Sequence, residues 1–117
     1  MKRGEIWTIS GGADYGSKPR PVVIVQHDSF DQTDSIIVCA FTRDKSEAPL
    51  YRLLVEPNER NGLRAVSRMM VDKITAIPKT KVGVCIGRLD DGDILRLNRA
   101  IFVFLGLADS LRSRPDT

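Results

Sequence analysis

The feature that most constrains the fold of this chain is a series of short apolar runs rich in β-branched residues. One of them, Val22-Val23-Ile24-Val25, lies in the segment Arg20 to Gln26 and is entered through Pro19 and Pro21. A run this short, with prolines at its entrance, is typical of a buried strand rather than of a helix. Comparable patterns predict strands at Arg3 to Ile9, Ser35 to Thr42, Tyr51 to Val55, Val66 to Ile77 (one bent strand or two short ones) and Val82 to Ile86.

The end of the chain has a helical pattern instead. Asp90 followed by Asp93 resembles a capping box with Asp in place of Glu, which is a signal for the start of a helix. Apolar residues then recur at intervals typical of one helix face: Ile94, Leu97, Ile101, Phe104, Leu105 and Ala108. This spacing predicts one amphipathic helix from about Asp91 to Leu107.

Several short strands followed by one helix predict a mainly β fold with a C-terminal helix (β+α). In a chain of 117 residues we expect the strands to form one small β-barrel, because closure removes exposed strand edges. We predict a single domain over residues 1–110 and a flexible polar tail over residues 111–117. The segment Ser10 to Pro19 contains several glycines and is expected to form a long flexible loop.

Hydropathy and charge narrow the range of partners. No apolar run approaches the roughly 18 residues that span a bilayer, and the N-terminus has no signal-peptide pattern. We therefore expect a soluble, cytoplasmic protein without membrane contact. The 18 basic and 15 acidic side chains leave a net charge of +3, and the sequence pI of about 9.1 permits a polyanionic partner without requiring one.

Few residues suit metal binding or nucleophilic catalysis. Cys39 and Cys85 lie inside apolar runs and have no second ligand at metal-binding spacing, so both are predicted to be buried free thiols. His27 is the only histidine and is predicted to be a structural residue at a strand end, which excludes a two-histidine nuclease within one chain. We expect no metal and no cofactor.

Polar residues at two predicted strand ends are the candidate functional residues. Lys18 and Arg20 lie at the rim of one strand, and the prolines on either side of Arg20 restrict where its guanidinium can point. Thr42 closes another predicted strand and is followed by Arg43. Taken singly, these residues also fit a solvated loop and a strand-end hydroxyl bonded to backbone.

Four segments together give the chain a family resemblance. They are Arg3-Gly4-Glu5-Ile6-Trp7, Lys18-Pro19-Arg20-Pro21-Val22-Val23-Ile24-Val25-Gln26, Ala40-Phe41-Thr42 and Val71-Asp72-Lys73-Ile74-Thr75-Ala76-Ile77. Their order and spacing resemble those of the MazF/PemK (Kid-like) toxins, the mRNA interferases of type II toxin–antitoxin systems. The resemblance spans almost the whole chain and implies a small SH3-like β-barrel of the CcdB/MazF type.

The resemblance also implies an activity. It implies a toxin that is a sequence-specific endoribonuclease, which cleaves single-stranded mRNA without metal and leaves 2′,3′-cyclic phosphate and 5′-hydroxyl ends. Arg20 suits charge stabilisation, because a guanidinium stays charged and grips phosphate at two points. Thr42 suits a hydroxyl hydrogen bond to the phosphate. A homodimer and a cognate antitoxin protein with an acidic, apolar segment are implied as well.

Further RNA contacts are expected around this pair. Tyr15 is the candidate for stacking on a base, whereas Trp7 and Phe41 alternate with strand neighbours and are predicted to be core. Asp72 is the candidate proton acceptor, or it reads a base edge. The predicted RNA-binding residues are Tyr15, Ser17, Lys18, Arg43, Arg68, Asp72 and Lys73.

The chain departs from the family pattern near Asp72. Met70 stands where the PemK-like branch has a catalytic Arg, and Arg68 and Lys73 are the candidate replacements. Thr75 stands where a basic residue is common, and Pro78 where the family often has a final Asp. Two other functions stay open: a non-enzymatic CcdB-like toxin that binds DNA gyrase, and a barrel of this type that has lost its activity.

Overall fold

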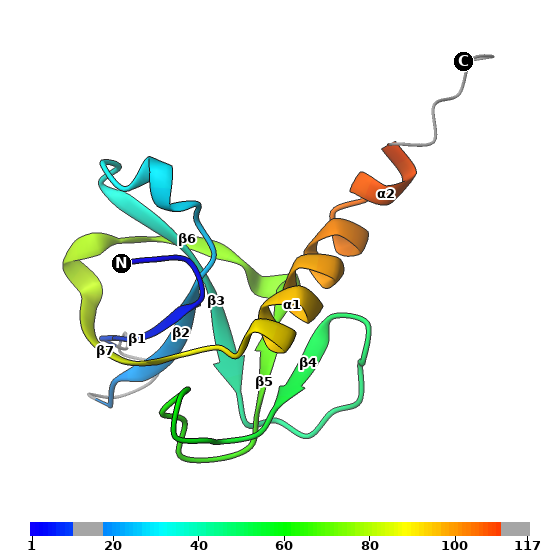
Figure 1. The fold of residues 1–117 in the computed structure, drawn as a ribbon, viewed down its shortest axis with the longest axis horizontal. Coiled ribbons are helices and arrows are strands. Elements are labelled where there is room, and N and C mark those ends of the chain that lie inside the picture. Colours follow the sequence, from blue (N-terminus) through cyan, green and yellow to red (C-terminus); the bar gives the residue numbers. More distant parts are fainter. Residues whose placement is uncertain (11–17, 111–117) are drawn as a thin grey trace.

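A computed structural model describes residues 1–10 and 18–110 of the chain and contains a curled antiparallel sheet with a helix packed against it (Figure 1). The strands are β1 (Glu5–Ile9), β2 (Arg20–Ile24), β3 (Ser35–Thr42), β4 (Arg52–Val55), β5 (Ser67–Met70), β6 (Thr75–Pro78) and β7 (Val82–Arg88). The helices are α1 (Asp91–Phe104) and α2 (Leu107–Ser110), with short 3-10 turns η2 (Asp28–Phe30), η3 (Val71–Lys73) and η4 (Lys79–Lys81). The predicted tail, 111–117, lies outside the described residues.

The predicted fold class is confirmed, although the sheet does not close. The strand order is β4-β5-β3-β2-β1-β7, and β6 pairs with β3 beside β5. Within the described residues β7 pairs only with β1, so hydrogen bonds do not complete the barrel. The short strand β6 ends at Pro78, whose nitrogen cannot donate to a further strand, and η4 then turns the chain into β7.

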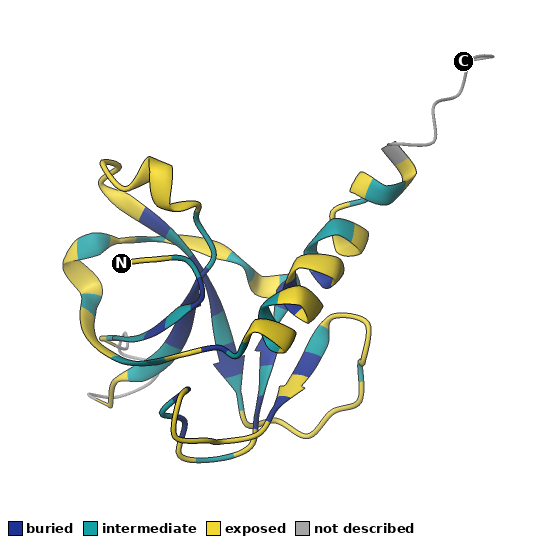
Figure 2. Ribbon diagram, in the orientation of Figure 1, coloured by how far each residue is buried: buried dark blue, intermediate teal, exposed yellow. Residues whose placement is uncertain are grey.

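Apolar side chains fill both faces of the central strands. Val23, Cys39 and Phe41 belong to a core that includes Leu97 and Ala100 of α1. A second cluster of buried residues, which we call the inner core, lies inside the curl of the sheet and comprises Val22, Ile24, Ile36 and Val38. Burial of both faces explains why the β2 and β3 sequences read as continuous apolar runs rather than alternating ones (Figure 2).

The C-terminal helix begins at Asp91 as predicted but differs in its cap and its end. Asp90 occupies the N-cap position without a capping side-chain hydrogen bond, because its carboxylate instead accepts a hydrogen bond from Nδ2 of Asn58 at 3.1 Å. The helix ends at Phe104 rather than Leu107, because Gly106 adopts a φ of +76° and interrupts it before α2.

The two cysteines behave differently, so one prediction is confirmed and one is wrong. Cys39 is buried, and burial raises the pKa of its thiol to about 12, as expected for an inert core residue. Cys85 is exposed. It lies on the edge strand β7, where Val84 is also exposed, so an apolar run there does not imply burial on both faces.

The predicted aromatic core residues are also only partly confirmed. Phe41 is buried in the core beneath α1. Trp7 is half-buried against the inner core, and its Nε1 donates a hydrogen bond to Oε1 of Glu5 at 3.0 Å. Among the described residues, no helix is long and apolar enough to cross a membrane.

A buried asparagine holds the turn between β4 and β5. Asn61 accepts hydrogen bonds from the backbone N–H groups of Asn58 and Leu63 and donates one to the carbonyl of Glu56. Its side chain is almost wholly buried. The adjacent Gly62 has a φ of +69°, and a Cβ there would lie 2.0 Å from the carbonyl oxygen of Ile86, so this position requires glycine.

We predict that Asn61→Ala lowers the free energy of unfolding by about 2–3 kcal/mol, because it leaves buried backbone groups without partners. Urea denaturation measures the change. Asn98→Ala, at an exposed position of α1, is the matched control and should be close to neutral. Equal stability of the two variants would show that the Asn61 hydrogen bonds contribute nothing.

Candidate functional site

Three polar residues are aligned across neighbouring strands at one end of the sheet. Thr42 on β3 lies directly opposite Arg68 on β5. On the other edge of β3, Val22 of β2 lies opposite Ala40, and continuing that register by two residues places Arg20 opposite Thr42. Residues opposite each other in an antiparallel pair have Cβ atoms about 4.5–5.5 Å apart and project to the same face. We call Arg20, Thr42 and Arg68 the polar row.

The polar row lies on the face of the sheet away from α1. Phe41 and Met69, the strand neighbours of Thr42 and Arg68, are buried in the core that α1 covers. Because successive strand residues point to opposite faces, Thr42 and Arg68 point away from the helix. The same face carries the inner core nearer the middle of the strands, so the polar row begins where that core ends.

A hydrogen bond from the backbone fixes the hydroxyl oxygen of Thr42. Its Oγ1 accepts a hydrogen bond from the backbone N–H of Asp44 at 3.1 Å, which fixes the position of the oxygen. The strand-end hydroxyl is therefore bonded to backbone, as one sequence interpretation expected. Since that contact uses an acceptor site, the hydroxyl hydrogen can still be donated to a ligand.

The loop after β3 holds the Arg68 side chain. Its Nη1 donates to the carbonyl oxygen of Asp44 at 3.2 Å, and its Nη2 lies 3.5 Å from Oε1 of Glu47. The Arg68 side chain retains 15% of its exposure, whereas that of Glu47 retains 81%. Glu47 is thus a weak, screened partner that an incoming anion can replace.

The predicted basic residues differ in exposure. Arg20 is half-buried at the start of β2, opposite Ile9 of β1. Lys18 is exposed two residues before Arg20, and Arg43 is exposed directly after Thr42. Lys73 is exposed at the end of η3. Tyr15 and Ser17 lie outside the described residues.

Asp72 is engaged by an arginine that the sequence analysis did not select. The Nε of Arg52 donates to Oδ1 of Asp72 at 2.7 Å, and its Nη2 donates to Oδ2 at 2.9 Å. The hydrogen bond from Arg52 is the main cause that holds the pKa of Asp72 below its usual range, with burial acting in the opposite direction. A carboxylate in this state is a poor general base near neutral pH.

The histidine and the acidic residues form no further centre among the described residues. His27 is the N-cap of η2, where its Nδ1 accepts a hydrogen bond from the backbone N–H of Ser29, which supports its predicted structural role. In residues 1–10 and 18–110, no group of three or more His, Cys, Asp or Glu side chains is placed to hold a metal ion.

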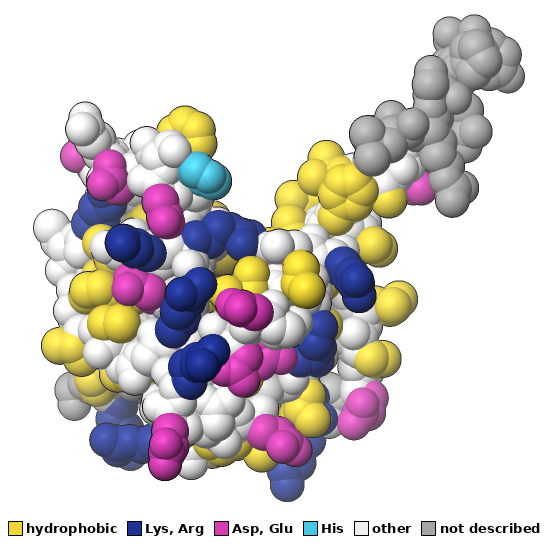
Figure 3. All heavy atoms as spheres, in the orientation of Figure 1, with side chains coloured by type: hydrophobic (Ala, Val, Ile, Leu, Met, Phe, Trp, Pro, Cys, Tyr) yellow, Lys and Arg dark blue, Asp and Glu magenta, His cyan; other side chains and the backbone are white. Residues whose placement is uncertain are grey.

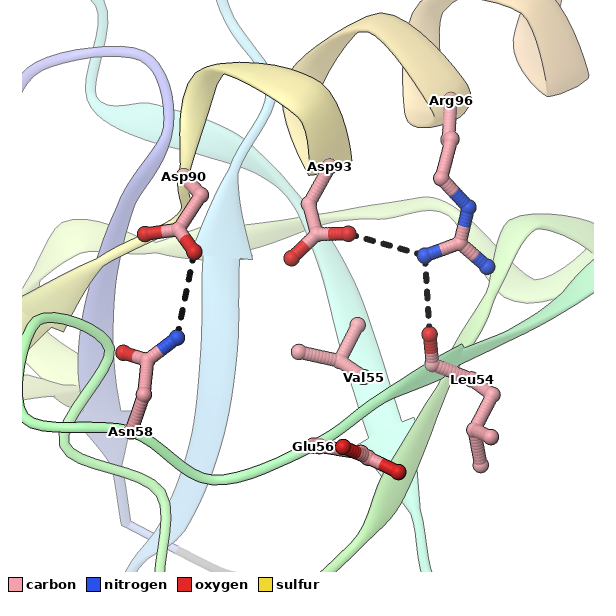
Figure 4. Close-up of a pocket in the computed structure, with 7 residues that line it drawn as sticks. All are labelled: Leu54, Val55, Glu56, Asn58, Asp90, Asp93 and Arg96. Carbon is pink, nitrogen blue, oxygen red and sulfur yellow. Dashed lines mark hydrogen bonds and ion pairs between the residues drawn. The ribbon is translucent and has the colours of Figure 1, made fainter.

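A cleft between β4 and the start of α1 has polar walls but belongs to the packing of the helix (Figure 4). Its lining residues are Leu54, Val55, Glu56, Asn58, Asp90, Asp93 and Arg96. Nη1 of Arg96 donates to the carbonyl of Leu54 and to Oδ1 of Asp93, both at 2.8 Å. Together with the Asn58–Asp90 hydrogen bond, these contacts bind the helix to the edge strand β4.

We predict that Asp72→Asn lowers the free energy of unfolding by about 1–2 kcal/mol near pH 7, because it removes one partner of a half-buried ion pair. The pKa of Asp72 is lowered in the folded state, so the pair stabilises the protein above the unfolded pKa of about 3.9. That stabilisation is lost as pH falls through the lower, folded pKa.

Urea denaturation between pH 7 and pH 2 measures this difference between wild type and variant. Asp31→Asn, at an exposed turn position, is the control and should be close to neutral in stability at pH 7. A difference for Asp72→Asn that stays constant down to pH 2 would contradict the assigned direction of the pKa shift.

Comparison with known proteins identifies the family of the chain. Residues 2–105 match the family model described as PemK-like, MazF-like toxin of type II toxin–antitoxin system. The chain is 44% identical over 108 residues to "Probable endoribonuclease MazF" of Mycolicibacterium smegmatis, an alignment that covers 92% of this chain and 99% of that protein.

Solved structures of low sequence identity share the fold. An endoribonuclease in complex with its cognate antitoxin from Mycobacterial species has a TM-score of 0.72 at 20% identity, covering 92% of this chain and 96% of that one. The Mycobacterium tuberculosis toxin MazF-mt6 has a TM-score of 0.69 at 23% identity, covering 85% and 94%. With the family model matched over residues 2–105, the chain belongs to the PemK-like, MazF-like toxins of type II toxin–antitoxin systems.

Proposed function

We propose that this toxin is an endoribonuclease that cleaves single-stranded mRNA at specific sequences without a metal, leaving 2′,3′-cyclic phosphate and 5′-hydroxyl ends. The observation that carries the proposal is the polar row, in which the strand register places two arginines on the strands either side of Thr42. The name of the relative from Mycolicibacterium smegmatis, "Probable endoribonuclease MazF", points the same way. An RNA substrate of this kind puts the activity in the cytoplasm.

The proposed chemistry is charge stabilisation by fixed donors. Attack of a 2′-hydroxyl on the adjacent phosphorus forms the cyclic phosphate and breaks the bond to the 5′-oxygen, and the proton lost by the 2′-hydroxyl is balanced by the one that the leaving 5′-oxygen gains. The phosphorane formed on the way carries extra negative charge on its oxygens. Arg20 meets that charge with a planar fork that stays protonated, and Thr42 donates its hydroxyl hydrogen from a position fixed by the Asp44 N–H. Donors carried by a rigid sheet need little reorganisation at the moment of reaction, and the position of both residues on strands of the sheet supports this role.

The surrounding residues are proposed to bind the rest of the RNA. Lys18, Arg43, Arg68 and Lys73 supply cations for neighbouring phosphates, and Arg68 is the one directly opposite Thr42. Tyr15 and Ser17 complete the predicted set. Asp72 contacts RNA, in this proposal, only through the arginine that it holds.

Homodimer formation is also proposed. Val103, Phe104, Leu105 and Leu107 are exposed where α1 and α2 extend past the sheet, and apolar side chains gather along this projection (Figure 3). A helical segment that is apolar on several sides needs a cover, and a second copy would provide one. Sedimentation at micromolar concentration tests this, and a monomer would contradict it.

We predict that Arg20→Ala and Thr42→Ala each reduce RNA cleavage by about 10²–10³-fold while the fold stays intact. Arg20→Lys should fail as well, because an ammonium does not reproduce a bidentate fork. The assay incubates the purified protein with a long single-stranded RNA in EDTA and maps the ends produced.

Arg99→Ala is the control, since this exposed cation lies on α1, which covers the opposite face of the sheet. Wild-type rates in the Arg20 and Thr42 variants would remove the site assignment, and cleavage only with Mg²⁺ would remove the metal-free mechanism. No cleavage at all would favour the gyrase-binding toxin or the inactive barrel.

We predict that RNA and the cognate antitoxin exclude each other. An acidic, apolar antitoxin segment is expected to cover the loop from Ser10 to Pro19 and the cations Lys18, Arg20, Arg43 and Arg68, since a surface that holds phosphates also attracts carboxylates. Saturating antitoxin should abolish RNA binding in a competition assay. Unchanged RNA affinity would refute this, as would an antitoxin segment that docks only on the outer face of the Asp91 to Leu107 helix.

A further inference from the structure

The ion pair of Arg52 and Asp72 leaves one edge of the guanidinium available. The carboxylate engages Nε and Nη2 of Arg52 in a side-on fork, at 2.7 and 2.9 Å. Among the described residues no hydrogen bond uses Nη1 of Arg52. The two side chains retain 16% and 20% of their exposure, so the pair is half-buried and still reaches solvent.

Strand register places Arg52 beside the polar row. Arg52 lies opposite Met70, and Leu54 lies opposite Arg68, so Arg52 and Arg68 share one face of the β4–β5 hairpin. Asp44, in the loop after β3, is close enough to both arginines for their charges to act on its carboxylate. Arg52 and Arg68 both contribute to lowering the pKa of Asp44, after the larger effect of its hydrogen bonds from Ser46.

We propose that Arg52 is a further phosphate-binding residue of this site and that Asp72 is its positioning residue. The inference rests on the proposed function, since it needs RNA as the ligand. Asp72 fixes the plane of the Arg52 guanidinium. The N–H groups of Nη1 can then donate to an oxygen of the phosphate that neighbours the one bound by Arg20 and Thr42.

The ion pair with Arg52 explains how the Asp72 carboxylate can lie beside a site that binds an anion. An isolated carboxylate there would repel RNA, whereas a carboxylate neutralised by Arg52 does not. A long arginine side chain left alone would lose rotamer freedom on gripping a phosphate, and the fork with Asp72 removes much of that cost before RNA arrives.

The test measures binding of a mixed-sequence, single-stranded RNA oligonucleotide with 2′-O-methyl riboses, which block attack by the 2′-hydroxyl. The Kd is measured as a function of salt for wild type, Arg52→Gln, Asp72→Asn and the double variant Arg52→Gln/Asp72→Asn. Each phosphate contact contributes about 0.7 to the slope of log K against log salt for a single strand.

Arg52→Gln should raise the Kd roughly tenfold and reduce the slope by about 0.7. The double variant is decisive, because it removes Arg52 without leaving a bare carboxylate. We expect it to stay weak, with the reduced slope. Return of the wild-type Kd and slope in the double variant would show that Arg52 only neutralises Asp72, and would overturn the inference.

Two readouts separate this inference from the proposed function and from a folding defect. Arg96→Gln removes an arginine paired with an aspartate, Asp93, on α1 and should leave Kd and slope unchanged. Thermal melts identify a variant that does not fold. Arg52→Lys then keeps the positive charge but removes the two-point hydrogen bonding of the guanidinium. It should bind RNA more weakly than wild type, and equal binding would count against a role for the guanidinium geometry. If wild-type protein neither binds nor cleaves RNA, both proposals fail; if Arg20→Ala weakens binding and the double variant does not, only this inference fails.

Discussion

Backbone hydrogen bonds hold β3 between β2 on one edge and β5 and β6 on the other, and the site depends on this pairing. Thr42 can lie beside both Arg20 and Arg68 only in this register. A slip of one residue would turn Thr42 toward α1 and bring Phe41 out of its core. The apolar side chains on both faces of β2 and β3 oppose such a slip, so the packing of the centre protects the geometry of the strand ends.

The position of the polar row follows from where the inner core stops. Val22 and Val38 are buried inside the curl of the sheet, and Ala40 packs against them. Beyond Ala40 the strands reach the rim, where charged and hydroxyl groups remain partly hydrated and need no buried partner. A rigid sheet therefore presents polar groups without having to bury them, which is the arrangement expected where donors must be held ready for a developing charge.

Charge balance near the row comes from contacts between distant parts of the chain. Arg68 is steadied by the loop after β3, through the Asp44 carbonyl and Glu47. Asp72 is neutralised by Arg52, which comes from the preceding strand of the hairpin. Arg68 and Arg52 are thus held by partners from other elements, and the one carboxylate that the family resemblance brought forward is not a free base.

Much of this protein could be predicted from local sequence. The bounds of β3 and the start of α1 at Asp91 follow from residue types and spacing within one element, and the order of short motifs selects Arg20 and Thr42 as site candidates. These features depend on interactions between near neighbours in the chain. Only the tertiary structure decided which faces are covered and which distant side chains meet: Cys85 is exposed because β7 is an edge strand, Asp90 bonds Asn58 instead of capping its helix, and Arg52 reaches Asp72 through the β4–β5 pairing. The physical reason is that the spacing of apolar residues predicts which residues share a face of one helix or strand. The register between strands, and which face another element covers, depend on packing between segments far apart in sequence.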